Sequence, residues 1–106
     1  MALSITTTNE GGRSIIAAQG EVDVSCASQL REAIDAAIDD GVRQIEVNLA
    51  EVPYIDSTGI GVLVGAAHRA LDVQARLVVS NPQRNVKRVL DLLGITAELG
   101  IDSPEA

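Results

Sequence analysis

Three adjacent polar residues, Asp56, Ser57 and Thr58, separate an apolar strand-like stretch from an apolar helix-like one. A serine hydroxyl in such a place can cap a helix, attack a substrate as a nucleophile or accept a phosphoryl group. The choice among these three roles largely determines which function the sequence predicts.

Nucleophilic catalysis by Ser57 would need a base within about 3 Å, and the only histidine is His68. If both residues lie on one helix, the rise from Ser57 to His68 separates them by about 16 Å along the helix axis. His68 therefore cannot activate Ser57 of the same chain. The Gly-x-Ser-x-Gly motif of the α/β-hydrolases is also absent, so we expect no serine hydrolase and no enzyme.

Metal and cofactor binding are not indicated. The glycines at 59 and 61 lack the Lys-Ser/Thr pair of a P-loop and the third glycine of a dinucleotide-binding motif. Cys26 is the only cysteine, which excludes an intrachain disulfide and a multi-cysteine metal site. We expect Cys26 to be a small packing residue, and we expect neither a cofactor nor a metal ion.

The net charge is −7, and residues 1–56 carry 10 acidic side chains against 3 basic ones. This half of the chain would repel phosphate backbones, and only Tyr54 could stack on a base. We therefore expect no nucleic-acid partner. The acidity keeps the domain soluble or presents an acidic face to a basic protein.

No segment approaches the roughly 18 apolar residues of a membrane span. The first residues also lack the basic and apolar regions of a signal peptide. These patterns predict a cytoplasmic protein with no membrane association. The length of 106 residues predicts a single domain over residues 1–106, with a frayed tail over 101–106.

Hydrophobic periodicity predicts an α/β domain with a mixed β-sheet, an N-terminal antiparallel hairpin and helices packed on the sheet. Apolar stretches at 3–7 and 14–19 flank a glycine turn, which is typical of a hairpin. Helical stripes that include Leu71 and Leu93 should face the sheet. The elements expected after the hairpin are a helix over 26–40, a strand over 45–49, a helix over 58–71, a strand over 75–79 and a helix over 82–93.

Capping residues predict where the helices begin and end. Ser25 should cap the first helix and Gly41 should follow its C-terminus. Asn81, followed by a proline, is typical of the start of the last helix. Taken as a cap, Ser57 would begin the middle helix, with Asp56 at the positive end of the helix dipole.

The sequence Tyr-Ile-Asp-Ser-Thr-Gly-Ile-Gly-Val-Leu at 54–63 resembles the signature of the anti-sigma factor antagonists, which belong to the STAS domain family. Gly-Glu-Val-Asp at 20–23, ahead of Leu-Arg-Glu-Ala at 30–33, is similar to a second landmark of that family. Asn-Pro at 81–82, ahead of a helix, is similar to a third. The three landmarks occur in the family's order, and the resemblance covers nearly the whole chain.

This resemblance implies a partner switch. In the family, an anti-sigma factor with serine kinase activity binds the unphosphorylated antagonist and so releases its sigma factor. The same partner phosphorylates the serine of the motif, here Ser57, and a PP2C-type phosphatase reverses the modification. By the same match, the partner-binding residues are Asp23, Asp56, Ser57, Thr58, Gly59 and Gly61.

The physical chemistry of the segment suits this implied role. A phosphoryl group on Ser57 would add about −1.5 to −2 charges, which a helix N-terminus tolerates. With Asp56 and Asp23 nearby, the local surface would become strongly negative, and a partner packed against it would be repelled. The fold should therefore survive while the complex dissociates.

Other roles remain open for the neighbouring residues and for the whole chain. Gly59 and Gly61 either expose backbone to the nucleotide of a kinase or pack tightly on a neighbouring element. Thr58 is either a solvent-facing helix residue or a second phosphoacceptor. The alternative function is a stand-alone STAS scaffold subunit of a stress-signalling or lipid-transport complex.

Overall fold

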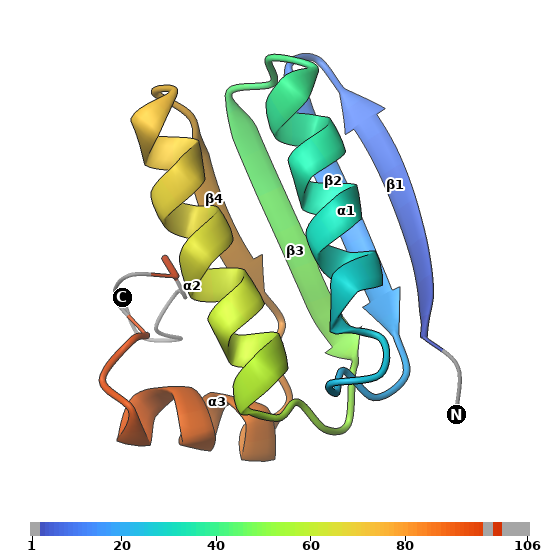
Figure 1. Ribbon diagram of the computed structural model, residues 1–106, viewed down its shortest axis with the longest axis vertical. Coiled ribbons are helices and arrows are strands. Elements are labelled where there is room, and N and C mark those ends of the chain that lie inside the picture. Colours follow the sequence, from blue (N-terminus) through green and yellow to red (C-terminus); the bar gives the residue numbers. More distant parts are fainter. Residues whose placement is uncertain (1–2, 97–98, 101–106) are drawn as a thin grey trace.

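The computed structural model describes residues 3–96 and 99–100, so the tail expected over 101–106 lies outside the described residues. Within them the chain forms a four-stranded sheet and three helices (Figure 1). In chain order the elements are β1 (Ser4–Glu10), β2 (Arg13–Gln19), α1 (Ala27–Asp39), β3 (Gln44–Glu51), α2 (Ser57–Asp72), β4 (Arg76–Ser80) and α3 (Arg84–Leu92).

The sheet has the strand order β1-β2-β3-β4. β1 runs antiparallel to β2, whereas β2 and β3, and likewise β3 and β4, are parallel. α1 and α2 lie side by side on one face of the sheet (Figure 1). The predicted α/β class, hairpin and mixed sheet are confirmed, with element bounds that differ from the expected ones by a few residues.

The hydrophobic core lies between the sheet and these two helices. Ile16, Val47 and Val79 are register partners on three neighbouring strands, and all three are buried. Leu30 of α1 and Leu63 of α2 belong to the same buried cluster. Because alternate residues of a strand face opposite sides, the residues between these core positions form the other face of the sheet.

α3 lies below the N-terminus of α2 in Figure 1, at the end of the sheet where β3 ends. Two side chains at its start are tied to the segment that leads into α2. Gln83 Nε2 donates a hydrogen bond to the carbonyl oxygen of Ala50 (2.9 Å), and Asn85 Nδ2 donates to that of Pro53 (2.6 Å). α3 therefore braces the loop that positions residues 56–58.

Two predicted helix caps are wrong. Ser25 Oγ donates to Asp23 Oδ1 (2.6 Å) and does not cap α1, whose N-cap residue is Cys26. Asn81 has a left-handed φ of +54°, and α3 begins only after Gln83. Short polar side chains near a helix start have several local partners to choose from, and here tertiary context selected other ones.

The predicted inward stripe is also wrong at the C-terminal end of α2. Leu71 is 64% exposed, whereas Ala66 and Ala70 are buried. At 100° per residue, Leu71 lies about 80° around the helix from the buried Leu63. Leu93, just beyond α3, is likewise exposed, whereas Gly41 follows α1 with the expected left-handed φ of +78°.

Candidate functional site

Two loops that are far apart in sequence lie side by side at the start of α2. The amide of Val22 donates to the carbonyl oxygen of Tyr54 (3.0 Å), and the amide of Asp56 donates to that of Val22 (3.0 Å). These bonds form a short parallel bridge between Val22 and Ile55. They bring the 20–23 segment and the 54–58 segment into one surface.

Asp56, and not Ser57, is the N-cap of α2. Its backbone is extended, and its Oδ1 accepts a hydrogen bond from the amide of Gly59 (3.0 Å). Its Oδ2 accepts from the amide of Val24 (3.1 Å), on the neighbouring loop. The carboxylate therefore caps one helix and ties two loops together, a double role that a single serine hydroxyl fills less well.

Ser57 is the first residue of α2, and both Ser57 and Thr58 are exposed. Neither hydroxyl has a hydrogen-bond partner among the described residues. The amides of the first helical turn lack intrahelical partners and point outward, so the Ser57 side chain lies in the positive field of the helix N-terminus. The arrangement leaves a hydroxyl that is free for modification.

Asp23 faces solvent on the adjoining loop and is held as an anion. Its Oδ1 accepts from Ser25 Oγ (2.6 Å), from the Ser25 amide (3.0 Å) and from the Cys26 thiol (3.4 Å). Hydrogen bonds from the Ser25 hydroxyl, the Cys26 thiol and the Ser25 amide lower the pKa of Asp23 below its ordinary value. Asp23 and Asp56 thus place two carboxylates on the surface that carries Ser57.

The two glycines of the segment have different surroundings. Gly59 is buried, and a Cβ atom there would lie 2.7 Å from Ile55 Cγ1 and 2.7 Å from Val22 Cγ1. Gly61 is exposed, and a Cβ atom there would meet no atom within 4 Å. Tight packing therefore explains Gly59, whereas only Gly61 leaves open surface beside Ser57.

Two exposed apolar residues flank this surface and were not among the predicted site residues. Val24 is 75% exposed and Tyr54 is 49% exposed. Val24 lies in the turn that follows Val22, and because residues two apart on a strand share a face, strand alternation did not predict that Val24 would be exposed. Tyr54 directly precedes the buried Ile55, so alternation along an extended segment could have identified Tyr54 from the sequence.

The structure bears on two further expectations. His68 lies on the exposed side of α2, about three helical turns beyond Ser57. Cys26 is buried, and its thiol also donates to the carbonyl oxygen of Glu21 (3.2 Å). Across residues 3–96 and 99–100, no cluster of three or more His, Cys, Asp or Glu side chains could hold a metal ion, and no helix is long and apolar enough to cross a membrane.

The sequence matches the family model of the STAS domain over residues 4–105. It is 32% identical over 95 residues to an "Anti-sigma-B factor antagonist" of Staphylococcus aureus, covering 90% of this chain and 88% of that protein. A protein of the same name from Staphylococcus epidermidis is 30% identical over the same shares.

Solved structures share the fold. The anti-sigma factor antagonist SpoIIAA in its unphosphorylated form superposes with a TM-score of 0.80 at 24% identity, over 96% of this chain and 90% of that one. An anti-sigma factor antagonist from Mycobacterium paratuberculosis has a TM-score of 0.85 at 20% identity, over 94% and 85% of the two chains. At these identities the likeness concerns the fold alone.

Proposed function

The chain belongs to the STAS domain family, and from that membership and the geometry around Ser57 we propose that it is an anti-sigma factor antagonist. In its unphosphorylated form it binds an anti-sigma factor with serine kinase activity, and a sigma factor is released. Phosphorylation of Ser57 by that partner ends the interaction, and a PP2C-type phosphatase restores it. The protein acts by binding, in the cytoplasm, and catalyses no reaction itself.

One observation carries the proposal: the Ser57 hydroxyl is exposed and without a hydrogen-bond partner in the described residues, on a rigid support. The two hydrogen bonds to the Asp56 carboxylate fix the backbone on both sides of the helix start. A kinase that transfers a phosphoryl group must hold the acceptor oxygen in line with the phosphate. A rigid helix start presents Ser57 Oγ in one position.

The same geometry explains why the modification would act as a switch. Exposed to water, a phosphoryl group on Ser57 is solvated and lies in the favourable field of the helix N-terminus. Covered by a partner, that group would be buried beside the Asp56 and Asp23 carboxylates. Burying an uncompensated charge costs several kcal/mol, so the complex dissociates while the fold remains.

The surface around Ser57 also indicates how the unphosphorylated protein would hold its partner. Val24 and Tyr54 offer exposed apolar area on the two loops that meet at the start of α2. Gly61, one turn further along α2, adds no side chain that would keep a partner away. We assign partner binding to Asp23, Asp56, Ser57, Thr58, Gly59 and Gly61, with Gly59 acting through the shape of the loop.

The test is phosphorylation by the candidate anti-sigma factor kinase from the same genome. With ATP, the wild-type chain should gain one phosphate by mass spectrometry, Ser57→Ala should gain none, and Thr58→Ala should still gain one. No incorporation into the wild-type chain, or undiminished incorporation into Ser57→Ala, would contradict the proposal.

A binding measurement tests the charge mechanism separately. Ser57→Asp should fold like the wild type but bind the same anti-sigma factor at least about tenfold more weakly, because it places a permanent charge at the helix start. Ser57→Ala should keep its affinity. Equal affinities for Ser57→Asp and the wild type would refute the charge mechanism, and co-purification with a membrane ATPase would favour a scaffold role.

A further inference from the structure

The sheet face opposite α1 and α2 carries a row of polar side chains where three parallel strands begin. Arg13 of β2 is the register partner of Gln44 of β3, and Gln44 is the register partner of Arg76 of β4. Neighbouring strands lie about 4.8 Å apart. Two guanidinium groups therefore rise from the same face, one strand away from Gln44 on either side.

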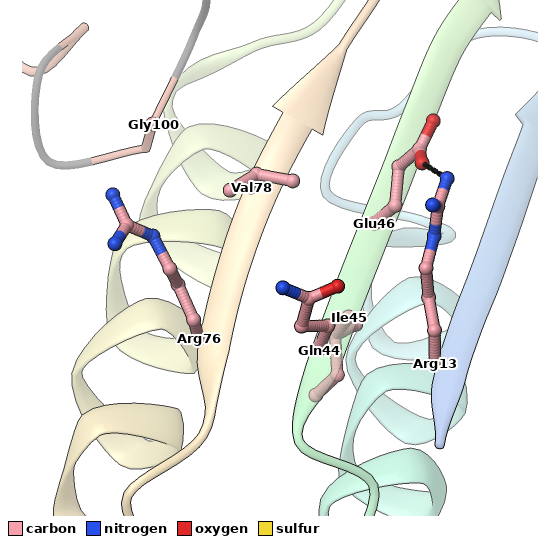
Figure 2. Close-up of a pocket in the computed structure, with 7 residues that line it drawn as sticks. All are labelled: Arg13, Gln44, Ile45, Glu46, Arg76, Val78 and Gly100. Carbon is pink, nitrogen blue, oxygen red and sulfur yellow. Dashed lines mark hydrogen bonds and ion pairs between the residues drawn. The ribbon is translucent and has the colours of Figure 1, made fainter. Parts of the chain in front are cut away.

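These residues line a cleft of about 380 Å³ (Figure 2). That volume lies within the range of small-molecule sites, about 300–1,000 Å³. The lining residues are Arg13, Gln44, Ile45, Glu46, Arg76, Val78 and Gly100.

The charges in the cleft are not balanced. Glu46 pairs with Arg13 through Oε1, and its Oε2 accepts a hydrogen bond from Ser80 Oγ (2.7 Å). Both carboxylate oxygens are therefore engaged, and the charge of Arg13 is neutralised. Figure 2 shows the guanidinium of Arg76 on the other side of Gln44, extended away from this pair.

The donors on the Arg76 side have no partners in the described part of the chain. Within residues 3–96 and 99–100, neither the Arg76 guanidinium nor the Gln44 side-chain amide makes a hydrogen bond or ion pair. A guanidinium offers five N–H donors and an amide two more, whereas the Glu46 carboxylate on the other side of the cleft already accepts from Arg13 and Ser80. An excess of donors with one positive charge selects an anion.

One wall of the cleft is tightly built. Gly100 has a left-handed φ of +61°, and a Cβ atom there would lie 2.8 Å from Val78 Cγ1. The preceding residue, Leu99, is buried, and its carbonyl oxygen accepts a hydrogen bond from the amide of Val79 (2.8 Å). The Leu99–Gly100 backbone is thereby held against β4, beside the guanidinium of Arg76.

We infer that this cleft binds a small oxyanion, a carboxylate or phosphate group, held by the Arg76 guanidinium with the Gln44 amide as a second donor. A planar guanidinium binds such groups through two parallel hydrogen bonds. Val78 supplies an apolar floor for a small organic body attached to the anion. The cleft and Ser57 lie at opposite ends of β3, about 25 Å apart, so the site is independent of the proposed phosphorylation switch.

The experiment is an NMR titration of the full-length ¹⁵N-labelled chain with sodium phosphate and, separately, sodium acetate. Sodium chloride at the same ionic strength is the control for screening. Saturable shifts of the Gln44, Arg76, Val78 and Gly100 amides are expected with at least one of the two anions and not with chloride. The arm that saturates at the lower concentration identifies phosphate or carboxylate as the preferred group.

Variants identify the residue responsible. Arg76→Gln should weaken binding at least about tenfold, which is the loss of one charge-assisted pair. Arg88→Gln, the same change at an exposed position of α3, should leave the affinity unchanged. Gln44→Ala, which keeps the charge, should weaken binding to a smaller extent.

Three outcomes overturn the inference. Shifts that are linear with concentration and equal for all three salts indicate screening only. Equal affinities for Arg76→Gln and the wild type place the anion elsewhere. Equal weakening in Arg76→Gln and Arg88→Gln reduces the effect to overall charge.

Discussion

The two ends of the central strands differ in how their polar groups are satisfied. At the Ser57 end, both oxygens of Asp56 and the Oδ1 atom of Asp23 accept hydrogen bonds from the first turn of α2 and from the 20–25 loop. At the Arg76 end, each oxygen of the Glu46 carboxylate accepts a hydrogen bond, while the guanidinium of Arg76 has no partner among the described residues. The carboxylates of the Ser57 end have their donors within the protein, whereas the Arg76 end has donors in excess among the described residues.

This difference separates two kinds of site. Carboxylates that are hydrogen-bonded within the protein hold the backbone in place and leave the hydroxyl of Ser57 exposed, which suits covalent modification and docking of a protein. Donors without partners are solvated in the free protein and gain from a ligand that replaces water. Substitutions at one end or the other test this difference, and they are taken from the largest expected effect to the smallest.

Gly59→Ala should disrupt the Ser57 end most strongly. The new Cβ would overlap Ile55 and Val22, and overpacking of this kind costs about 1–3 kcal/mol. Gly61→Ala, the matched control, should be neutral or stabilise by up to about 1 kcal/mol, since it meets open space in a helix. Urea unfolding of both variants measures the difference, and equal stabilities would show that the packing at Gly59 is not restrictive.

Asp56→Ala should cost about 1–2 kcal/mol, because it removes the helix cap and leaves the Val24 amide without its acceptor. Asp56→Asn keeps an oxygen for the cap and should recover most of the loss. The free energy of unfolding tests both. An Ala variant as stable as the wild type would mean that the two loops hold each other without the carboxylate.

Glu46→Gln should increase the affinity of the cleft for anions, because it leaves Arg13 as a second guanidinium without a neutralising carboxylate. The amide can still contact Ser80 and Arg13, but the negative charge is gone. We expect phosphate or acetate to bind about fivefold more tightly, roughly 1 kcal/mol, in the same NMR titration. Weaker binding would mean that Glu46 mainly holds Arg13 in place for the anion.

The smallest expected effect is the contribution of Asp23 to folding stability at acid pH. Because its folded-state pKa is lowered, its contribution to stability is present above the ordinary value of 3.8 and is lost as pH falls through the lower pKa. The difference in unfolding free energy between the wild type and Asp23→Ala should shrink as the pH falls below about 4. Glu32→Gln serves as the control, and a difference independent of pH would exclude the linkage.

Much of the fold could be predicted because the pattern is local. Alternation along the strands, helical periodicity and the turn glycines identified every helix and strand of the described chain and the class of the sheet. The caps were less predictable, since a residue one or two positions from Ser25, Ser57 and Asn81 takes the N-cap place of each helix. Which side chain wins depends on bonds to loops that are distant in sequence, as with Asp56 and the amide of Val24.

The sequence by itself determined the order of elements, the Asp-Ser-Thr segment at the start of α2 and the exclusion of His68 as a base for Ser57. These follow from period, spacing and residue type. Tertiary structure alone decided that Asp56 caps the helix, that Gly59 is packed while Gly61 is open, and that Arg13, Gln44 and Arg76 share one cleft. Each of these depends on which strands and loops become neighbours, and strand order and register join residues that local periodicity cannot connect.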